Sequence, residues 1–313
     1  MSSQRGGRAS RWTADDIPSQ QGRSVIVTGA NTGLGFQAAA MFAAKGADVV
    51  LACRDEAKAE SAVARIMERL PVGSVRAARL DLADLDSVRA FADDFANRQD
   101  RLDVLVNNGG VMWPPLSRTA QGFEVQFGTN HLGHFALTGR LLPLLLRTPA
   151  ARVTTVTSLA QVTGHIDFED MHWDKRRYST GAAYAQSKLA NMMFALELDR
   201  KLRAVGSHVV STASHPGWTF TDLTRHSPAV LRRVSPFIGM PPEVGALTTM
   251  RAATDPDAPG GSYWGPARLF GTKGHPAPAR IPRRARDIVA AARLWAESTR
   301  LTGVRYPLAA STG

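Results

Sequence analysis

Short apolar runs alternate with longer segments of helical periodicity along most of this chain. The β-branched run at residues 24–28 ends at Gly29, which is typical of a buried parallel strand. The same pattern predicts strands at 48–52, 75–82, 102–106, 152–157 and 208–214, and a short last one at 263–264. Helices are predicted at 38–44, 56–70, 85–97, 123–146, 182–205, 242–253 and 286–300. This alternation predicts a parallel sheet that helices cover on both faces.

The chain shows no composition break or linker beyond its start. Residues 1–22 are polar and lack apolar periodicity, so we expect a flexible tail there. Residues 23–313 then form a single domain. Within it, residues 222–242 are apolar and proline-rich, which fits a substrate lid or a plain surface connection equally well.

Composition excludes several classes of protein. The chain is 44% hydrophobic and 21% charged, which excludes wholesale disorder. Its single cysteine, Cys53, excludes an intramolecular disulfide and a multi-cysteine metal site. No apolar stretch approaches the roughly 18 residues of a membrane span, and residues 1–12 lack the apolar core of a secretory signal. We therefore expect a cytoplasmic protein without a membrane span.

The net charge of +11 is concentrated in a basic C-terminal extension. Residues 225–313 hold 13 Lys/Arg against 5 Asp/Glu. Most such excess charge is a solvated face, although it can also attract an anionic cofactor, a nucleic acid or a membrane.

A glycine-rich turn follows the first predicted strand. Its glycines are spaced G-x-x-x-G-x-G and precede a predicted helix. A pyrophosphate can approach such a bare backbone, and the helix N-terminus offers it free N–H groups. The residues expected to hold a dinucleotide here are Gly29, Asn31, Thr32, Gly33, Leu34 and Gly35.

The end of the second strand indicates the form of this dinucleotide. An NAD site usually places an acid there for the ribose hydroxyls, but this chain has Cys53 followed by Arg54. A guanidinium attracts a 2′-phosphate, so NADP(H) is preferred over NAD(H). NAD(H) stays open, because Asp55 could supply the acid while Arg54 faces solvent.

Four polar residues are candidates for catalysis. Tyr184 and Lys188 lie four apart on a predicted helix and so share one face. A neighbouring ammonium lowers the pKa of a phenol, which suits the pair to acid–base work on a carbonyl or alcohol oxygen. Ser158 follows the fifth strand and could hold the reacting oxygen. Asn130 lies inside a helix, where asparagine is slightly unfavourable, so we expect it to have a hydrogen-bonding role.

Together these residues resemble the short-chain dehydrogenase/reductase family from about residue 24 to the C-terminus. The cofactor motif Thr-Gly-x3-Gly-x-Gly appears at residues 28–35, and Asn-Asn-Ala-Gly appears at 107–110 with glycine in place of alanine. The catalytic set Asn-Ser-Tyr-Lys maps onto the four residues named above. By resemblance, further cofactor contacts are Asp81, Leu82, Asn108, Gly109, Tyr184, Lys188, Pro216, Gly217, Thr219 and Thr221.

The resemblance implies an α/β fold: a single-domain Rossmann-type doubly wound parallel sheet of about seven strands, in the order 3-2-1-4-5-6-7. The sequence segments Asn-His-Leu-Gly-His-Phe and Tyr-Ala-Gln-Ser-Lys-Leu-Ala-Asn are most similar to those of the retinol dehydrogenase-type group and its soluble bacterial relatives. Its implied reaction is hydride transfer between NADP(H) and a carbonyl or alcohol, with Tyr184 as general acid/base. Apolar residues around 228–240 favour a small hydrophobic substrate. Residues 164–181 form an insertion that bears on specificity or is a surface loop.

Other classes fit the sequence less well. Four histidines, at 131, 134, 165 and 172, lack a carboxylate motif that would complete a metal site, so no metal is expected. A non-catalytic dinucleotide-binding sensor or scaffold usually loses the tyrosine or lysine that this chain keeps. Arginines at 232–233 and 280–286 lack interleaved aromatic residues, so no nucleic-acid partner is expected. A homo-oligomer stays open, because the basic extension could block the helices through which relatives pair.

Overall fold

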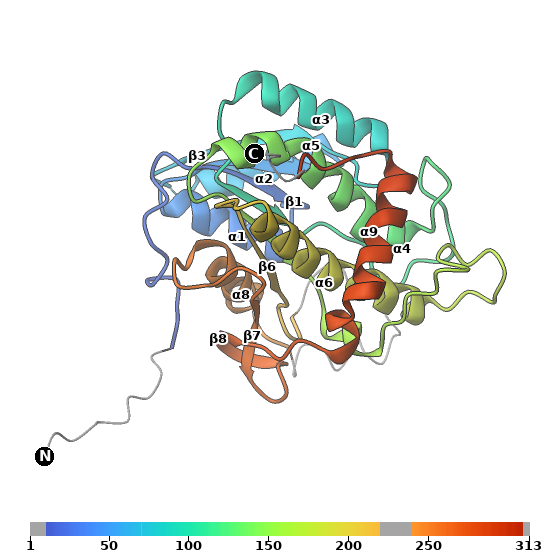
Figure 1. Ribbon diagram of the computed structural model, residues 1–313. Coiled ribbons are helices and arrows are strands. Elements are labelled where there is room, and N and C mark those ends of the chain that lie inside the picture. Colours follow the sequence, from blue (N-terminus) through green and yellow to red (C-terminus); the bar gives the residue numbers. More distant parts are fainter. Residues whose placement is uncertain (1–10, 70, 220–238, 309–313) are drawn as a thin grey trace, which may run out of the picture.

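The computed structural model describes residues 11–69, 71–219 and 239–308. Helices pack on both sides of one central sheet (Figure 1). The strands are β1 (Ser24–Thr28), β2 (Asp48–Cys53), β3 (Ser74–Arg79), β4 (Val104–Asn107), β5 (Arg152–Val156), β6 (Val210–Ser214), β7 (Tyr263–Arg268) and β8 (Lys273–Pro278). The longer helices are α1 (Gly33–Ala44), α2 (Glu56–Met67), α3 (Leu85–Arg98), α5 (Gly133–Arg147), α6 (Thr180–Ala204), α8 (Pro242–Thr254) and α9 (Ile288–Thr302).

The strand order is β3-β2-β1-β4-β5-β6-β7-β8. The first seven strands pair in parallel, which confirms the predicted doubly wound sheet and its order. The sequence did not predict β8, which pairs antiparallel with β7 at the edge of the sheet. Its two prolines, Pro276 and Pro278, are tolerated at an edge because no further strand needs their missing N–H groups.

Two apolar clusters cover the two faces of the sheet. One packs α3, α5 and α6 on one face, with Phe91, Leu141 and Phe194 among its members. The other packs α1, α2 and α8 on the opposite face, with Phe42 and Met250 among its members. Because β1, β4 and β5 lie between these layers, they are wholly buried, which explains their continuous apolar and β-branched runs.

The start and the end of the described chain both pack onto this body. Trp12 and Ile17 are buried in the α1/α2/α8 cluster, so residues 11–22 are not the flexible tail that the sequence suggested. Isolated apolar residues anchor this segment, and they give no periodic signal. At the other end, α9 lies across α6 (Figure 1), and the Tyr306 hydroxyl donates to the Phe135 carbonyl of α5 at 2.7 Å.

The predicted helix at 123–146 is not continuous. A short helix α4 (Val125–Phe127) leads into one wide π-helical turn, η1 (Gly128–Leu132), before α5 begins. Single π-turns inside helices often occur at functional sites, and this one carries Asn130. Most of the proposed lid at 222–242 lies outside the described residues.

Candidate active site

The carboxyl ends of β1, β4, β5 and β6 meet at one edge of the sheet, which is where ligands bind in doubly wound folds. The loops that follow these strands carry the glycine turn, the segment at 107–110, Ser158 and the Pro216–Gly217 pair. The structure therefore brings these four segments, which are far apart in the sequence, together at one rim.

The glycine turn lies against the loop after β4. Gly29 has a φ of +62°, and a Cβ at this position would lie 2.7 Å from the Gly109 Cα. A Cβ on Gly35 would lie 2.5 Å from the Gly29 carbonyl oxygen, so neither position accepts a side chain. Helix α1 begins at Gly33 with no acidic residue in its first turn, and Leu34 belongs to that turn. A turn without side chains that leads into a helix N-terminus with no acidic residue fits a pyrophosphate.

Thr28, the last residue of β1, connects this turn to α5 and to the π-turn η1. Its Oγ1 accepts the N–H groups of Asn108 at 2.9 Å and Gly109 at 2.8 Å. It also lies 2.9 Å from Nε2 of the buried His134, whose Nδ1 lies 2.9 Å from the Asn130 carbonyl. A carbonyl only accepts, so Nδ1 carries the proton and Nε2 accepts the Thr28 hydroxyl. Burial lowers the pKa of His134 to about 4, which keeps the ring neutral in this chain of bonds.

The other residues around the turn are held in defined positions. The Asn108 side chain donates to the Thr28 carbonyl at 2.8 Å. Asp81 Oδ1 accepts the Ala83 N–H at 2.9 Å. The buried Leu82 contacts the open side of Gly109, because a Cβ there would lie 2.9 Å from its Cδ1. Leu82, Asn108 and Gly109 thus lie beside the turn, and Asp81 directly precedes Leu82.

Asn130 is fully buried in the π-turn and holds the loop after β4. Its Oδ1 accepts the Val111 N–H at 2.8 Å, and its Nδ2 donates to the Val111 carbonyl and to Ser187 Oγ, each at 3.0 Å. A Cβ on Gly110 would lie 2.8 Å from Asn130 Oδ1 and 3.7 Å from the Lys188 ammonium. Asn130 therefore lies next to Lys188, and its side chain is already engaged with protein groups.

Tyr184 and Lys188 project from α6 toward Ser158 at the end of β5. Tyr184 is 5% exposed, and its hydroxyl hydrogen-bonds with the Ser158 side chain. The Lys188 ammonium lies 5.8 Å from the centre of the Tyr184 ring and donates to the Val156 carbonyl at 3.2 Å. Ser158 also begins a short 3-10 helix, η2 (Leu159–Thr163), as its N-cap. The predicted Ser-Tyr-Lys set is thus assembled in three dimensions.

The protonation of this set differs from the prediction. Burial raises the pKa of Tyr184 to about 12, and the hydrogen bond with Ser158 offsets only part of this rise. Burial thus outweighs any lowering of the Tyr184 pKa by Lys188, and burial also lowers the pKa of Lys188 itself to about 8. At neutral pH the phenol therefore keeps its proton while the lysine remains largely charged.

Basic side chains surround the far end of the turn. A shallow cavity of about 440 Å³ is lined by Asn31, Thr32, Asp55, Ala57, Lys58, Ser61 and Arg65. Asp55 is engaged within it, since its carboxylate caps α2 at the Lys58 N–H and pairs with the Lys58 ammonium at 2.9 Å. Arg65 donates to the Asn31 carbonyl at 2.8 Å. The sequence did not single out Lys58 or Arg65. Lys58 lies in the first turn of α2 and Arg65 in its last turn, and the exposed Arg54 precedes Asp55, which lines this cavity.

The loop after β6 closes the rim on the other side. Gly217 has a φ of +69°, and Thr219 Oγ1 donates to the Pro216 carbonyl at 2.8 Å. Thr219 and Leu34 both lie within about 3 Å of the Cβ position of Gly245 on α8, so this loop meets the glycine turn. Thr221 lies outside the described residues.

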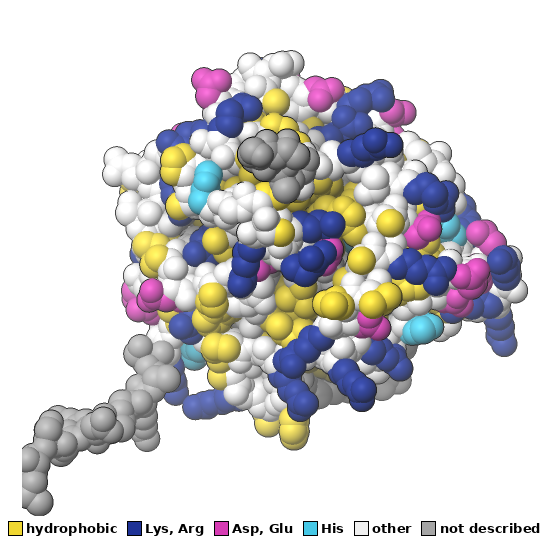
Figure 2. Space-filling view, in the orientation of Figure 1, with side chains coloured by type: hydrophobic (Ala, Val, Ile, Leu, Met, Phe, Trp, Pro, Cys, Tyr) yellow, Lys and Arg dark blue, Asp and Glu magenta, His cyan; other side chains and the backbone are white. Residues whose placement is uncertain are grey.

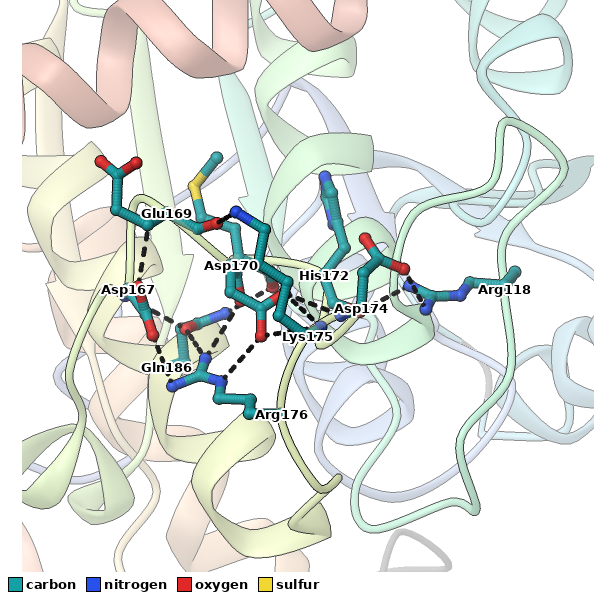
Figure 3. A network of polar contacts seen from close by, with 10 residues as sticks. Arg118, Asp167, Glu169, Asp170, His172, Asp174, Lys175, Arg176 and Gln186 are labelled. Carbon is teal, nitrogen blue, oxygen red and sulfur yellow. Dashed lines mark hydrogen bonds and ion pairs between the residues drawn. The ribbon is translucent and has the colours of Figure 1, made fainter.

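The insertion at 164–181 is organised by an ion-pair network (Figure 3). Arg176 pairs with Asp167 at 2.9 Å and with Asp170 at 3.4 Å, and its guanidinium lies 3.8 Å from the centre of the Trp173 ring. Arg118, from the loop after β4, pairs with Asp174 at 2.7 Å. These contacts tie the insertion to the segment before Asn130.

The two histidines beside Asn130 have partners within the protein. His134 bonds to Thr28, and His131 Nε2 lies 2.8 Å from Ser298 Oγ on α9. Across the described ranges, no group of three or more His, Cys, Asp or Glu side chains is placed to hold a metal ion. Over the same ranges, no helix is long and apolar enough to cross a membrane.

Comparison with known proteins agrees with this geometry. The sequence profile of the short chain dehydrogenase family matches residues 23–230. Human retinol dehydrogenase 13 is 43% identical over 296 residues, covering 91% of this chain and 86% of the relative. Mouse polyprenol dehydrogenase is 43% identical over 302 residues, covering 92% and 86% respectively.

Two solved structures share the fold. A crystal structure of an uncharacterized protein from Mycobacterium Paratuberculosis is 45% identical with a TM-score of 0.80, covering 96% of this chain and 100% of that chain. The Pseudomonas aeruginosa RhlG/NADP active-site complex is 28% identical with a TM-score of 0.63, covering 78% and 94%. The fold and site define a Rossmann-type NAD(P)-dependent oxidoreductase that acts on alcohol or carbonyl groups. The chain belongs to the short-chain dehydrogenase family.

Proposed function

We propose that this protein transfers a hydride between NADP(H) and a hydrophobic carbonyl or alcohol, with Tyr184 as the general acid/base. The observation that carries the proposal is the buried Tyr184 hydroxyl, bonded to Ser158 and adjacent to the Lys188 ammonium, at the rim that also holds the glycine turn.

The residues at the rim fit a dinucleotide. The side-chain-free turn at Gly29 and Gly35 and the N-terminus of α1 would hold its phosphates, while Lys188 and the Asn108–Gly109 segment border the space toward Tyr184. When bound, the nicotinamide ring supplies or accepts the hydride.

The chain's own side chains handle the proton and the orientation. Ser158 donates a hydrogen bond to the substrate oxygen and fixes it beside the Tyr184 hydroxyl. In the reductive direction the neutral phenol, with its pKa raised to about 12, gives its proton to the oxygen as negative charge develops there. The Lys188 ammonium then stabilises the phenolate that remains. Asn130 supports this relay by holding the loop beside Lys188.

A preference for NADP(H) is supported by charge at the ribose end. Asp55 is engaged by α2 and Lys58, so no free acid is offered to the ribose hydroxyls at this point. Arg54, Lys58 and Arg65 make the same end basic, which suits a 2′-phosphate. A hydrophobic substrate is supported by relatives that are named for retinol and polyprenol, both apolar alcohols. A cytoplasmic location remains a prediction of the sequence.

Replacing Tyr184 tests the assignment. Tyr184→Phe should bind NADPH as the wild type does, because the hydroxyl faces Ser158, yet kcat on a panel of hydrophobic aldehydes and ketones should fall at least about 100-fold. Tyr306→Phe is the matched control, since this hydroxyl donates to the Phe135 carbonyl of α5, away from the rim. Near-normal turnover of Tyr184→Phe would refute the assignment. NADPH binding by the wild type without turnover of any carbonyl or alcohol would favour the sensor function instead.

Cofactor preference has a separate test. Arg54→Ala should raise the Kd for NADPH about tenfold or more and leave that for NADH nearly unchanged, because only NADPH carries the 2′-phosphate. Arg89→Ala, at an exposed position of α3, serves as the control. Equal changes for both cofactors would remove the phosphate-binding role.

A further inference from the structure

The β7–β8 hairpin carries a pair of large apolar side chains in solvent. Phe270 is 101% exposed and Leu269 is 63% exposed. Both adopt left-handed backbone angles, with φ of +55° and +50°, where asparagine or glycine is the comfortable choice. Two bulky apolar residues at a strained, exposed turn are unfavourable for a surface in water alone, and such strain is concentrated at functional sites.

This hairpin extends beyond the rim of the site. Ser214, the last residue of β6, pairs with Trp264, and β7 continues to Arg268 before the chain turns. The hairpin is fixed to the loop after β6, because the Trp218 N–H donates to the Thr272 carbonyl at 2.9 Å. The hairpin that carries the apolar tip is therefore anchored to the rim of the site.

Other exposed apolar side chains lie on neighbouring segments. Val162 is on η2, whose Leu159 contacts the hairpin at Gly271, while Ile288 and Val289 begin α9. Arg284 connects these segments by donating to the Gly164 carbonyl at 2.7 Å. Figure 1 draws the hairpin and the start of α9 along the same lower edge of the molecule.

The charge of this region is mainly positive, although Asp287 caps the start of α9. Residues 258–286 contain no Asp or Glu, but they contain six basic residues: Arg268, Lys273, Arg280, Arg283, Arg284 and Arg286. Within the described ranges, no carboxylate lies within salt-bridge distance of any of the six. Figure 2 shows basic side chains around apolar atoms along the lower edge of this face. Protruding apolar side chains in a region whose cations have no carboxylate partner match the interface of an anionic bilayer, in which apolar groups insert and cations stay among the headgroups.

We propose that this surface, formed by the hairpin tip at 269–270, the basic residues of 268–286 and the start of α9, docks the enzyme on an anionic lipid bilayer. A nucleic-acid partner would explain the arginines but not Leu269 and Phe270, because apolar side chains make no favourable contact with a phosphate backbone. Docking by this surface places the rim of the site close to the membrane. An apolar substrate dissolved in lipid then reaches the site without crossing water.

Vesicle co-sedimentation with the full chain tests the proposal. The wild type should bind vesicles of phosphatidylcholine with about 30% phosphatidylglycerol, bind pure phosphatidylcholine far less, and lose affinity as salt rises. Leu269→Asn combined with Phe270→Gly should weaken binding about tenfold or more. These residues suit the left-handed backbone, so this variant should melt no lower than the wild type.

Matched controls separate this surface from general charge and apolarity. Val72 is 76% exposed and precedes β3, the edge strand opposite to β8. Val72→Ser removes this exposed apolar side chain and should bind vesicles as the wild type does. Arg280→Glu with Arg283→Glu should weaken binding, whereas Arg69→Glu with Arg147→Glu should not. The inactive Tyr184→Phe variant should bind vesicles normally, so failure of the proposed reaction and failure of docking are distinguishable.

Three results would overturn the proposal: no preference of the wild type for anionic vesicles, equal binding by the hairpin variant, or binding to duplex DNA in place of vesicles. A dimer that the hairpin variant dissolves, with no vesicle binding by the wild type, would assign the surface to a second copy of the chain instead.

Discussion

Replacing Lys188 with methionine should make the protein more stable and inactive at the same time. The Lys188 side chain is buried, and its pKa falls from 10.5 to about 8. At about 1.4 kcal/mol per pKa unit, burial of this charge costs roughly 3 kcal/mol at neutral pH. Methionine fills nearly the same volume without a charge. The Val156 carbonyl that Lys188 leaves keeps a partner, because Asn191 Nδ2 donates to it at 3.2 Å.

The pH dependence of this gain identifies its cause. Between pH 8 and 10.5 the unfolded wild type binds more protons at Lys188 than the folded protein does, so wild-type stability rises with pH across this window. The advantage of Lys188→Met should therefore be near its full size below pH 8 and vanish toward pH 10.5.

Denaturant unfolding of the cofactor-free protein at several pH values measures this difference, and carbonyl reduction with NADPH measures the activity. Activity should fall at least about 100-fold, since no ammonium stabilises the Tyr184 phenolate. Lys201→Met, farther along α6 on a partly exposed ion pair with Glu197, should change stability by less than about 1 kcal/mol. A variant that is less stable than the wild type at pH 7, or a gain that persists unchanged at pH 10.5, would refute this reasoning.

Two further substitutions test how the glycine turn is held. One removes the contact between Thr28 and His134 on α5, and the other disturbs the contact between Gly29 and Gly109. His134→Phe removes the ring that accepts the Thr28 hydroxyl, so the unfolding free energy should fall by about 1–3 kcal/mol and NADPH should bind more weakly in a fluorescence titration. The folded pKa of His134 is about 4 against 6.5 unfolded, so wild-type stability is lost as pH falls through this window, and an equally steep acid profile in the variant would contradict the assignment. Gly29→Ala should raise the KM for NADPH at least about tenfold, because its Cβ would meet Gly109. Gly22→Ala, also at positive φ but with open space around it, isolates the backbone cost; a similar KM in both variants would show that the contact with Gly109 is unimportant.

The layered sheet could be predicted from the sequence because its central strands are buried on both faces. Their continuous apolar runs, such as Ser24–Thr28, and the helices between them determine a parallel order with little ambiguity. Strand β8 was not predicted, because Lys273–Pro278 contains neither a run of β-branched residues nor an alternation of apolar and polar residues. Its pairing depends on β7 beside it, and no local pattern reports such a partner.

The placement of the proposed catalytic residues side by side could be predicted, but their protonation could not. Spacing places Tyr184 and Lys188 on one face of a helix whatever surrounds them. The pKa of each depends on how completely neighbouring elements exclude water, and here burial outweighs the attraction between the two groups. The π-turn at Asn130 could not be predicted for a similar reason, because its geometry depends on contacts with the loop after β4 and with α6.

Lys58 and Arg65, which line the cavity beside the glycine turn, could not be predicted for a different reason. Lys58 and Arg65 belong to α2, where exposed basic residues are common, so nothing in the local sequence separates them from a solvated face. Only the packing of α2 beside the glycine turn, with Arg65 donating to the Asn31 carbonyl, gives them significance.

The packing of α9 has a consequence for how the chain is synthesised. Phe135 and Phe194 leave the ribosome long before Trp295 and Tyr306, the aromatic residues that cover them in the finished protein. During that interval a growing chain presents an uncovered aromatic face, which is where chaperones and other nascent chains adhere. A stop codon or a frameshift before residue 288 would leave that face permanently bare, so such products should accumulate as aggregates rather than as a shorter enzyme.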